Sequence, residues 1–233
     1  MCGRYAITLP PEAVARLFGA SGPPPDFAPR YNAAPGQALP IIRRRPRGKG
    51  RELALARWGL VPSWSTGPDS RFSMINARAE TVAARPAYRG AFLRRRCLVP
   101  ASGFYEWRAT ARGKQPWLFT PAAGKAFALA GLWERWSGAG GEAITSFTIL
   151  VTDANADVAA VHDRMPVILA RAHHALWLGE AGAAAERDLH ALLAPAPAGA
   201  LRLWPVDRRV NSPENNDAGV MEAIREAKEG LLP

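Results

Sequence analysis

The sequence predicts an α+β fold built on a mainly antiparallel β-sheet, curled into a barrel-like core and flanked by short helices. Three observations predict it. Apolar and polar residues alternate through several middle segments, helical periodicity marks short segments on either side, and the two types do not follow a strict βαβ order. With 233 residues, 48% of them hydrophobic, the chain is long enough for a single domain over residues 1–233 with a substantial core.

In the first half of the chain, proline and glycine mark where the predicted helix and strands begin and end. Residues 10–20 open with proline, place apolar residues at helical spacing and reach Gly19, so they predict a short helix. Residues 21–37 are too rich in proline and glycine for regular structure and predict an ordered loop. Strands are expected at 38–44 and 52–58, joined by the basic hairpin tip "RRRPRGKGR".

The middle of the chain predicts a run of strands at residues 97–101, 103–108, 115–120, 127–136 and 144–152. Cys97 is expected at the start of a buried strand. Alternation within 103–108 places Glu106 on the face opposite Tyr105 and Trp107, either toward solvent or lining a pocket.

Helical periodicity predicts helices at residues 75–95, 155–162, 170–179, 185–194 and 213–230. Asn76 then caps the first of these and Asn211 or Ser212 caps the last. His162 falls at the C-terminal end of its helix, where a histidine is favourably placed. Residues 194–199, "APAPAG", predict a loop within the domain.

Charge is the most informative feature of the composition. Residues 1–117 hold 20 Lys and Arg against 6 Asp and Glu, a net charge of +14, whereas residues 118–233 hold 10 against 14. A strongly basic half predicts a polyanionic partner, with nucleic acid favoured over an acidic membrane surface because no basic amphipathic helix is apparent.

Several classes of protein are disfavoured by what the sequence lacks. Two cysteines are too few for a disulfide framework, and no CxxC or HExxH spacing predicts a metal site. No apolar run approaches the roughly 18 residues of a membrane helix, and the start does not resemble a signal peptide. We therefore expect a cytoplasmic protein, without metal or cofactor, that is nucleoid-associated when bound to DNA and monomeric.

The chain begins "MCGRYA", so removal of Met1 would give Cys2 a free α-amine beside its thiol. In unperturbed form these groups titrate at about 7.7 to 8.0 and about 8.5, so both supply nucleophile near neutral pH. Asn76, Glu106 and His162 add an amide, a carboxylate and an imidazole in otherwise apolar surroundings. A nucleophile, a carboxylate, an imidazole and an amide are the groups that catalysis at a carbonyl carbon requires. The sequence spacing alone does not show that they lie close together in space.

The chain resembles the SOS-response-associated peptidase family of abasic-site processing proteins over nearly its whole length. The resemblance runs in order through "MCGRYA", "PRYNAAPGQ", "RWGLVPSW", "INARAET", "RCLVPASGFYEW", "FALAGLWERW", "HDRMPVIL" and "VDRRVNSPENND". It implies that the family's catalytic positions fall on Cys2, Asn76, Glu106 and His162.

The resemblance also implies a reaction. Cys2, freed of Met1 by autopeptidase activity, condenses with the aldehyde of an abasic site in single-stranded DNA and closes a thiazolidine crosslink. Glu106 and His162 transfer protons during formation and reversal, and Asn76 holds the sugar or the terminus. Failure to close the ring leaves a Schiff base that undergoes β-elimination, which is a lyase activity.

DNA contacts are expected at Arg4 and Arg78, which lie two residues from Cys2 and Asn76, and at Trp64 and Trp107, which suit stacking on exposed bases. Two alternatives remain open on the sequence alone. An N-terminal-nucleophile glutamine amidotransferase explains Cys2 but not the charge, and a noncatalytic single-stranded DNA-binding protein explains the charge but not Cys2.

Overall fold

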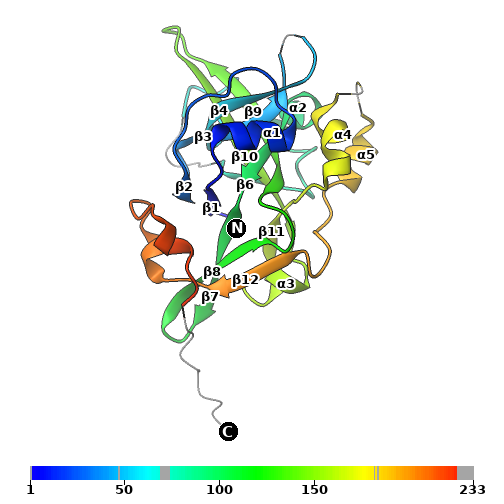
Figure 1. Cartoon of the computed structure of the whole chain (residues 1–233). Coiled ribbons are helices and arrows are strands. Elements are labelled where there is room, and N and C mark those ends of the chain that lie inside the picture. Colours follow the sequence, from blue (N-terminus) through cyan, green and yellow to red (C-terminus); the bar gives the residue numbers. More distant parts are fainter. Residues whose placement is uncertain (1, 47, 69–73, 181, 183, 225–233) are drawn as a thin grey trace.

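A computed structural model of the chain describes residues 2–46, 48–68, 74–180, 182 and 184–224, and strands dominate it (Figure 1). The strands are β1 (Arg4–Ile7), β2 (Arg30–Ala33), β3 (Ala38–Arg44), β4 (Arg51–Trp58), β5 (Asn76–Arg78), β6 (Arg96–Ala101), β7 (Gly103–Thr110), β8 (Gly113–Pro121), β9 (Phe127–Ser137), β10 (Ala143–Asp153), β11 (Arg164–Pro166) and β12 (Leu201–Pro205). The α+β class with mainly antiparallel pairing is confirmed.

One sheet closes on itself. Its strands pair in the order β10, β4, β3, β6, β9, and β9 pairs again with β10, so the ring of hydrogen-bonded neighbours is complete. Among the strand pairs of the described residues, those of β10 with β4 and with β5 are parallel and the others are antiparallel, and an isolated parallel bridge joins Ala20 to Arg51. Closure removes the exposed edges that an open sheet would present. The curled core expected from the sequence is therefore a small barrel.

A second sheet of five strands, ordered β12, β8, β7, β1, β2, packs against this barrel. One face contributes Phe104 and Phe119 to the large barrel core, where their rings stack with centroids 5.0 Å apart. The opposite face carries Tyr105 and Leu118, which are buried beneath Val210 and its neighbours in a second, smaller cluster. The two faces of β7 consequently lie in different environments.

The helices are short: α1 (Pro11–Phe18), α2 (Pro86–Arg94), α3 (Ala156–Ala159), α4 (His174–Leu178) and α5 (Glu186–Ala191), with single 3₁₀ turns at Arg171–His173, Arg208–Asn211 and Ala218–Met221. Helix α1 begins at a proline and ends at Gly19, whose φ of 66° is the left-handed conformation that glycine adopts readily.

Two helix predictions are wrong in extent. Residues 76–78 form a strand, and the helix within 75–95 starts only at Pro86, because proline lacks the N–H that a helix interior needs and is favoured at its start. Within 213–224 the only helical turn is 218–221, capped by the Asp217 side chain rather than by Asn211 or Ser212. Residues 225–230 of that prediction lie outside the described residues.

The barrel interior is tightly packed. Cys97 is fully buried in β6, as expected, and a methyl group placed on the facing Gly131 would approach the Cys97 sulfur to 2.8 Å. No helix in the described part of the chain has the length and apolar character needed to cross a membrane.

Candidate functional site

Cys2 lies at the entrance to β1, and its side chain is fully buried. Burial, reinforced by the nearby charge of Glu106, raises the pKa of the Cys2 thiol far above its usual value. Its sulfur is 3.9 Å from the carbonyl oxygen of Arg4. The thiol is consequently protonated at neutral pH, and a base must remove its proton before sulfur can act as a nucleophile. Met1, whose removal the sequence predicts, lies outside the described residues.

Glu106 lies close to Cys2 because β1 pairs with β7. Arg4 faces Tyr105 across the two antiparallel strands, so the next residue of β7 lies beside the chain that leads back to Cys2. The side chain of Glu106 is only 2% exposed, and burial raises its pKa to about 7. A carboxyl group with this pKa exchanges a proton readily at neutral pH, which suits it to act as both acid and base.

His162 completes a group of three residues. Its Nε2 lies 3.9 Å from Oε2 of Glu106, and its Nδ1 accepts a hydrogen bond of 3.0 Å from the backbone N–H of Arg164. Burial is the main cause that lowers the pKa of His162. The neutral ring therefore carries its proton on Nε2 and directs it toward Glu106.

A second contact of His162 belongs to a different protonation state. Nδ1 is also 2.8 Å from the carboxylate of Asp163, a pairing that needs a proton on Nδ1. The Asp163 side chain is 85% exposed, so solvent screens this attraction. The lowered pKa and the Arg164 hydrogen bond both favour the neutral form.

Asn76 lies in β5, beside Ile149 of β10. This position corrects the prediction that Asn76 caps a helix. Both polar atoms of its side chain are buried and make no hydrogen bond within the described chain, while its backbone oxygen accepts a hydrogen bond from the Tyr88 hydroxyl. A buried amide without partners costs about 1–3 kcal/mol per unsatisfied group, so this side chain contributes nothing to stability that explains its burial.

Arg164 connects the two sides of the site and was not identified from the sequence. Its guanidinium donates to both carboxylate oxygens of Glu80, at 2.7 and 2.8 Å, and also binds Asp153. Because Glu80 follows β5 and Arg164 begins β11, this pair ties the Asn76 strand to the His162 segment. The arginine in "HDRMP" was the available signal, but its partner is 84 residues away.

The four expected DNA-binding residues occupy different surroundings. Arg4 donates to Asn32 Oδ1 and the Val210 carbonyl, both at 2.8 Å, and Trp107 donates to Asn211 at 2.8 Å. These two side chains thus bind the C-terminal segment on the face of β7 opposite Glu106, as strand alternation predicts. Arg78 and Trp64 are exposed, Trp64 by 69%.

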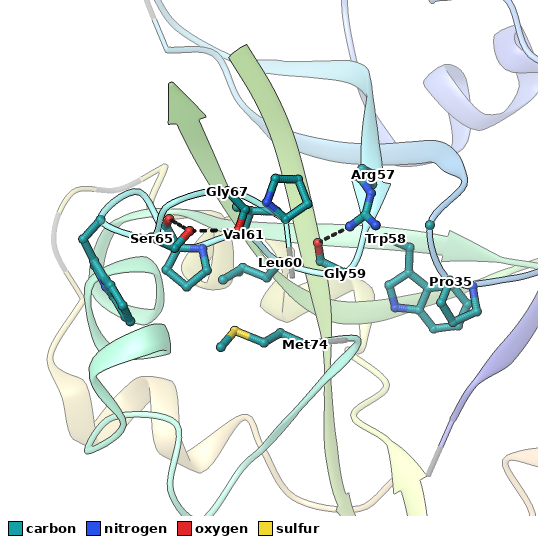
Figure 2. Close-up of a pocket in the computed structure, with 13 residues that line it drawn as sticks. Pro35, Arg57, Trp58, Gly59, Leu60, Val61, Ser65, Gly67 and Met74 are labelled. Carbon is teal, nitrogen blue, oxygen red and sulfur yellow. Dashed lines mark hydrogen bonds between the residues drawn. The ribbon is translucent and has the colours of Figure 1, made fainter. Parts of the chain in front are cut away.

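Trp64 borders a largely apolar pocket of about 380 Å³ (Figure 2). Its lining residues come from the segment before β3, the end of β4, the segment after β4 and the residue two positions before β5: Pro35, Gly36, Arg57, Trp58, Gly59, Leu60, Val61, Pro62, Trp64, Ser65, Gly67, Pro68 and Met74. The indole N–H of Trp58 donates to the Ile75 carbonyl, and its ring packs edge-on against Tyr5 with centroids 5.1 Å apart. Through Trp58 the pocket therefore adjoins β1, which follows Cys2, and the residue that precedes Asn76.

The structure thus brings Cys2, Glu106 and His162 into one group and places Asn76 on the neighbouring strand. In the described ranges, no group of three or more His, Cys, Asp or Glu side chains has the arrangement of a metal site. What the arrangement offers is a buried thiol, a carboxyl group that titrates near neutrality and a neutral imidazole, which suits proton transfer at a carbonyl or imine carbon.

Fold and site together define a β-barrel protein with an acid–base pair beside a cysteine at the start of the chain. The sequence pattern of the SOS response associated peptidase (SRAP) family matches residues 1–213. The chain belongs to this family.

Named relatives match over almost the whole chain. It is 36% identical to the abasic site processing protein YoaM of Bacillus subtilis, over 96% of this chain and 98% of the relative. It is 29% identical to the abasic site processing protein HMCES of Xenopus tropicalis, over 96% of this chain and 78% of that protein.

Solved structures share the fold. A protein from Bacteroides thetaiotaomicron superposes with a TM-score of 0.86 at 24% identity, covering 96% of this chain and all of the other. A protein from Bordetella bronchiseptica gives 0.73 at 31% identity, covering 88% of this chain and all of the other.

Proposed function

We propose that this protein responds to DNA damage by binding abasic sites in single-stranded DNA and forming a covalent crosslink through Cys2 once Met1 has been removed. The observation that carries the proposal is the buried Cys2 beside Glu106 and His162 at the start of β1. The names of YoaM and HMCES, both abasic site processing proteins, support abasic DNA as the substrate.

The first step joins the Cys2 amine to the sugar. The amine nitrogen attacks C1′ of the ring-opened abasic aldehyde, and the carbonyl oxygen leaves as water, which gives an imine. Departure of that oxygen requires a proton. Glu106, with a pKa of about 7, has a substantial protonated fraction at neutral pH and supplies it.

The second step closes the ring. The Cys2 sulfur bonds to C1′, the imine electron pair moves to nitrogen, and the proton leaving sulfur ends on that nitrogen. Because burial keeps the thiol protonated, its proton needs a carrier, and the carboxylate of Glu106 is placed to serve. The neutral ring of His162 lies 3.9 Å from Glu106 and relays protons with it. The product is a thiazolidine.

Asn76 contributes binding rather than proton transfer. An amide has two donor hydrogens and a carbonyl acceptor but does not titrate. Hydrogen bonds to the sugar or to the Cys2 terminus would satisfy the buried side-chain atoms that have no partner in the described chain.

Two further activities follow from the same groups. If sulfur does not close the ring, loss of a C2′ proton from the imine expels the 3′ phosphate, which is a lyase reaction. Release of Met1 would begin with attack of the Cys2 sulfur on the Met1 carbonyl carbon, and the Cys2 nitrogen leaves as an amine after it accepts a proton. Water then hydrolyses the resulting thioester, which frees Met1 and restores the thiol. Glu106 and His162 carry the protons, and the protein would be its own thiol-dependent peptidase.

DNA binding precedes this chemistry. Arg78 and Trp64 are exposed near the Asn76 strand, and the pocket in Figure 2 has apolar walls that fit a planar base. Arg4 and Trp107 keep the C-terminal segment against β1 and β7 and contact DNA through their exposed edges. An unpaired strand is the preferred partner because no duplex must be unstacked to reach the sugar.

The decisive experiment is a denaturing gel of the protein mixed with an abasic oligonucleotide or an intact one. We expect a slow-migrating species with the abasic strand alone, and an intact mass that starts at Cys2. Cys2→Ala keeps an amine but should lose the stable adduct and retain strand cleavage.

Two results would contradict the proposal. Active protein that retains Met1 in full would exclude the α-amine of Cys2, and a Cys2→Ser adduct as stable as that of wild type would exclude a role for sulfur. Glutamine hydrolysis without an adduct would favour an amidotransferase, and binding without any adduct would favour a noncatalytic single-stranded DNA-binding protein.

A further inference from the structure

The hairpin formed by β7 and β8 leads directly away from the candidate site. The two strands pair from Phe104 opposite Phe119 to Thr110 opposite Gly113. Gly113 has a φ of 97°, and the Thr110 hydroxyl donates to its carbonyl oxygen, so the turn is well defined. Figure 1 shows the hairpin tip at the lower end of the described chain, away from helices α1, α2, α4 and α5.

Beyond Glu106, the hairpin carries basic residues and no acidic ones. Arg108, Arg112 and Lys114 lie on it, and from residue 107 to residue 133 the sequence contains no Asp or Glu. Arg112 and Lys114 are exposed. A region of one sign of charge concentrates a polyanion at its surface. The hairpin is therefore suited to an anionic strand.

Glu106 lies on one face of the hairpin, and further side chains on the same face extend from it toward the turn. Trp117 lies directly opposite Glu106 across the two strands, and Arg108 follows Glu106 by two residues, so all three side chains share a face. The Arg108 guanidinium lies over the Trp117 ring, 4.8 Å from its centroid. The indole N–H of Trp117 is buried and has no acceptor among the described residues.

Lys114 pairs with Ala109 beside the turn, on the face of the hairpin opposite Arg108, and its side chain is exposed. After burial, its positive charge is among the influences that lower the pKa of His162. An exposed cation at the turn of the hairpin attracts the phosphates of a strand that lies along the hairpin, and the stacked Arg108 is held in one orientation by the indole.

We propose that the β7–β8 hairpin is a phosphate-binding arm that holds the DNA strand on one side of the abasic sugar. Arg108 and Lys114 neutralise backbone phosphates, and the Trp117 N–H donates to an oxygen of the sugar–phosphate backbone. The arm extends from Glu106 in a single direction, so it contacts the strand either 5′ or 3′ of the lesion but not both. This inference rests on the proposed function.

The test compares two variants that each remove two positive charges. Arg108→Gln/Lys114→Gln alters the arm, and Lys125→Gln/Arg202→Gln is the matched control, since Arg202 faces Thr120 at the end of β8 farthest from the turn. Binding of an abasic oligonucleotide is measured from about 50 to about 200 mM salt. For the arm variant we expect at least roughly tenfold weaker binding and a slope of log K against log salt that is smaller by about 1.4, because each phosphate that is no longer neutralised accounts for about 0.7.

The same variants are then tested on strands with the abasic site near the 5′ end or near the 3′ end. The arm defect should disappear with one of these strands, which lacks the phosphates that the arm binds, and persist with the other. Trp117→Phe keeps the ring and removes the N–H, so it should weaken binding several-fold without changing the slope.

Three results would contradict the proposed arm. They are a wild-type salt slope in Arg108→Gln/Lys114→Gln, an equal loss of affinity in the control variant, and an equal loss of affinity for the strands with the abasic site near the 5′ end and near the 3′ end. Failure of the wild-type protein to crosslink the abasic strand is a different outcome, because it removes the proposed function before the arm is tested.

Discussion

At the scale of single residues, the site depends on how burial changes acidity. The thiol of Cys2 and the carboxyl of Glu106 both have raised pKa values because they are withdrawn from water. The pKa of Glu106 is about 7, whereas the pKa of Cys2 lies far above neutrality. A protonated thiol and a carboxyl group that titrates near neutrality are complementary, since one holds the proton that the other can move. Two predictions test this relationship.

Glu106→Gln should slow both formation and release of the crosslink, because the amide keeps the shape but transfers no proton. We expect effects of at least roughly tenfold, as general acid–base catalysis commonly contributes more than this. The preformed, labelled adduct is mixed with excess unlabelled abasic oligonucleotide, and its disappearance is followed with time. Release at the wild-type rate would show that Glu106 has a structural role, and His162 would then be the next candidate for the acid–base group.

Glu106 should also make stability depend on pH. A carboxyl group with a pKa near 4.5 when unfolded and about 7 when folded takes up a proton on folding between those values. Its stabilising contribution is complete below about pH 4.5 and is lost as pH rises through about 7, to a total of about 3 kcal/mol. Urea denaturation of DNA-free protein should show this decline, and Glu106→Gln should abolish it. Parallel curves for the two proteins would exclude a raised pKa.

At the scale of elements, β10 organises the site. It pairs with β5, which carries Asn76, and with β11, which follows His162, while Arg164 binds Glu80 across them. The relative positions of the amide and the imidazole thus depend on one strand and one ion pair.

Removing that ion pair should disturb the site more than the fold. Arg164→Gln and Glu80→Gln should each lower stability by about 1 kcal/mol or less, since Glu80 is 47% exposed, but each should slow crosslinking several-fold. The double variant should be no slower than either single one, because both remove the same interaction. Multiplicative effects on rate would show that the two residues act independently.

Strands could be predicted from the sequence better than helices. The segments around Cys97 and Glu106 are strands as predicted, and every residue of β6 and the first four residues of β7 are buried, so both faces of these segments are covered. Residues 75–85 show helical spacing, yet β10 offers unpaired hydrogen-bonding groups that Asn76–Arg78 satisfy as a strand, and no local pattern reveals that partner. The clustering of Cys2, Glu106 and His162 likewise depends on pairing between distant strands. The family resemblance suggested it, whereas spacing did not.

At the scale of the whole molecule, the positive charge of the first half should dominate the affinity for DNA. Arg78→Ala should weaken binding of single-stranded abasic DNA and flatten its salt slope by about 0.7, because one phosphate is no longer neutralised. Arg187→Ala, which alters an exposed arginine in α5, is the control and should leave the slope unchanged. A salt-independent binding constant in the wild-type protein would remove nucleic acid as the partner.

The hydrogen bonds from Arg4 to the carbonyl groups of Val210 and Asn211 have a consequence for biosynthesis. The bonded residues are 206 and 207 positions apart, so these two contacts form only when nearly the entire chain has left the ribosome, later than the residues of β2 and β7 that pair with β1 become available. Until then the Arg4 guanidinium lacks both of these acceptors. The side of β1 that faces the C-terminal segment is therefore covered last, when synthesis is almost finished.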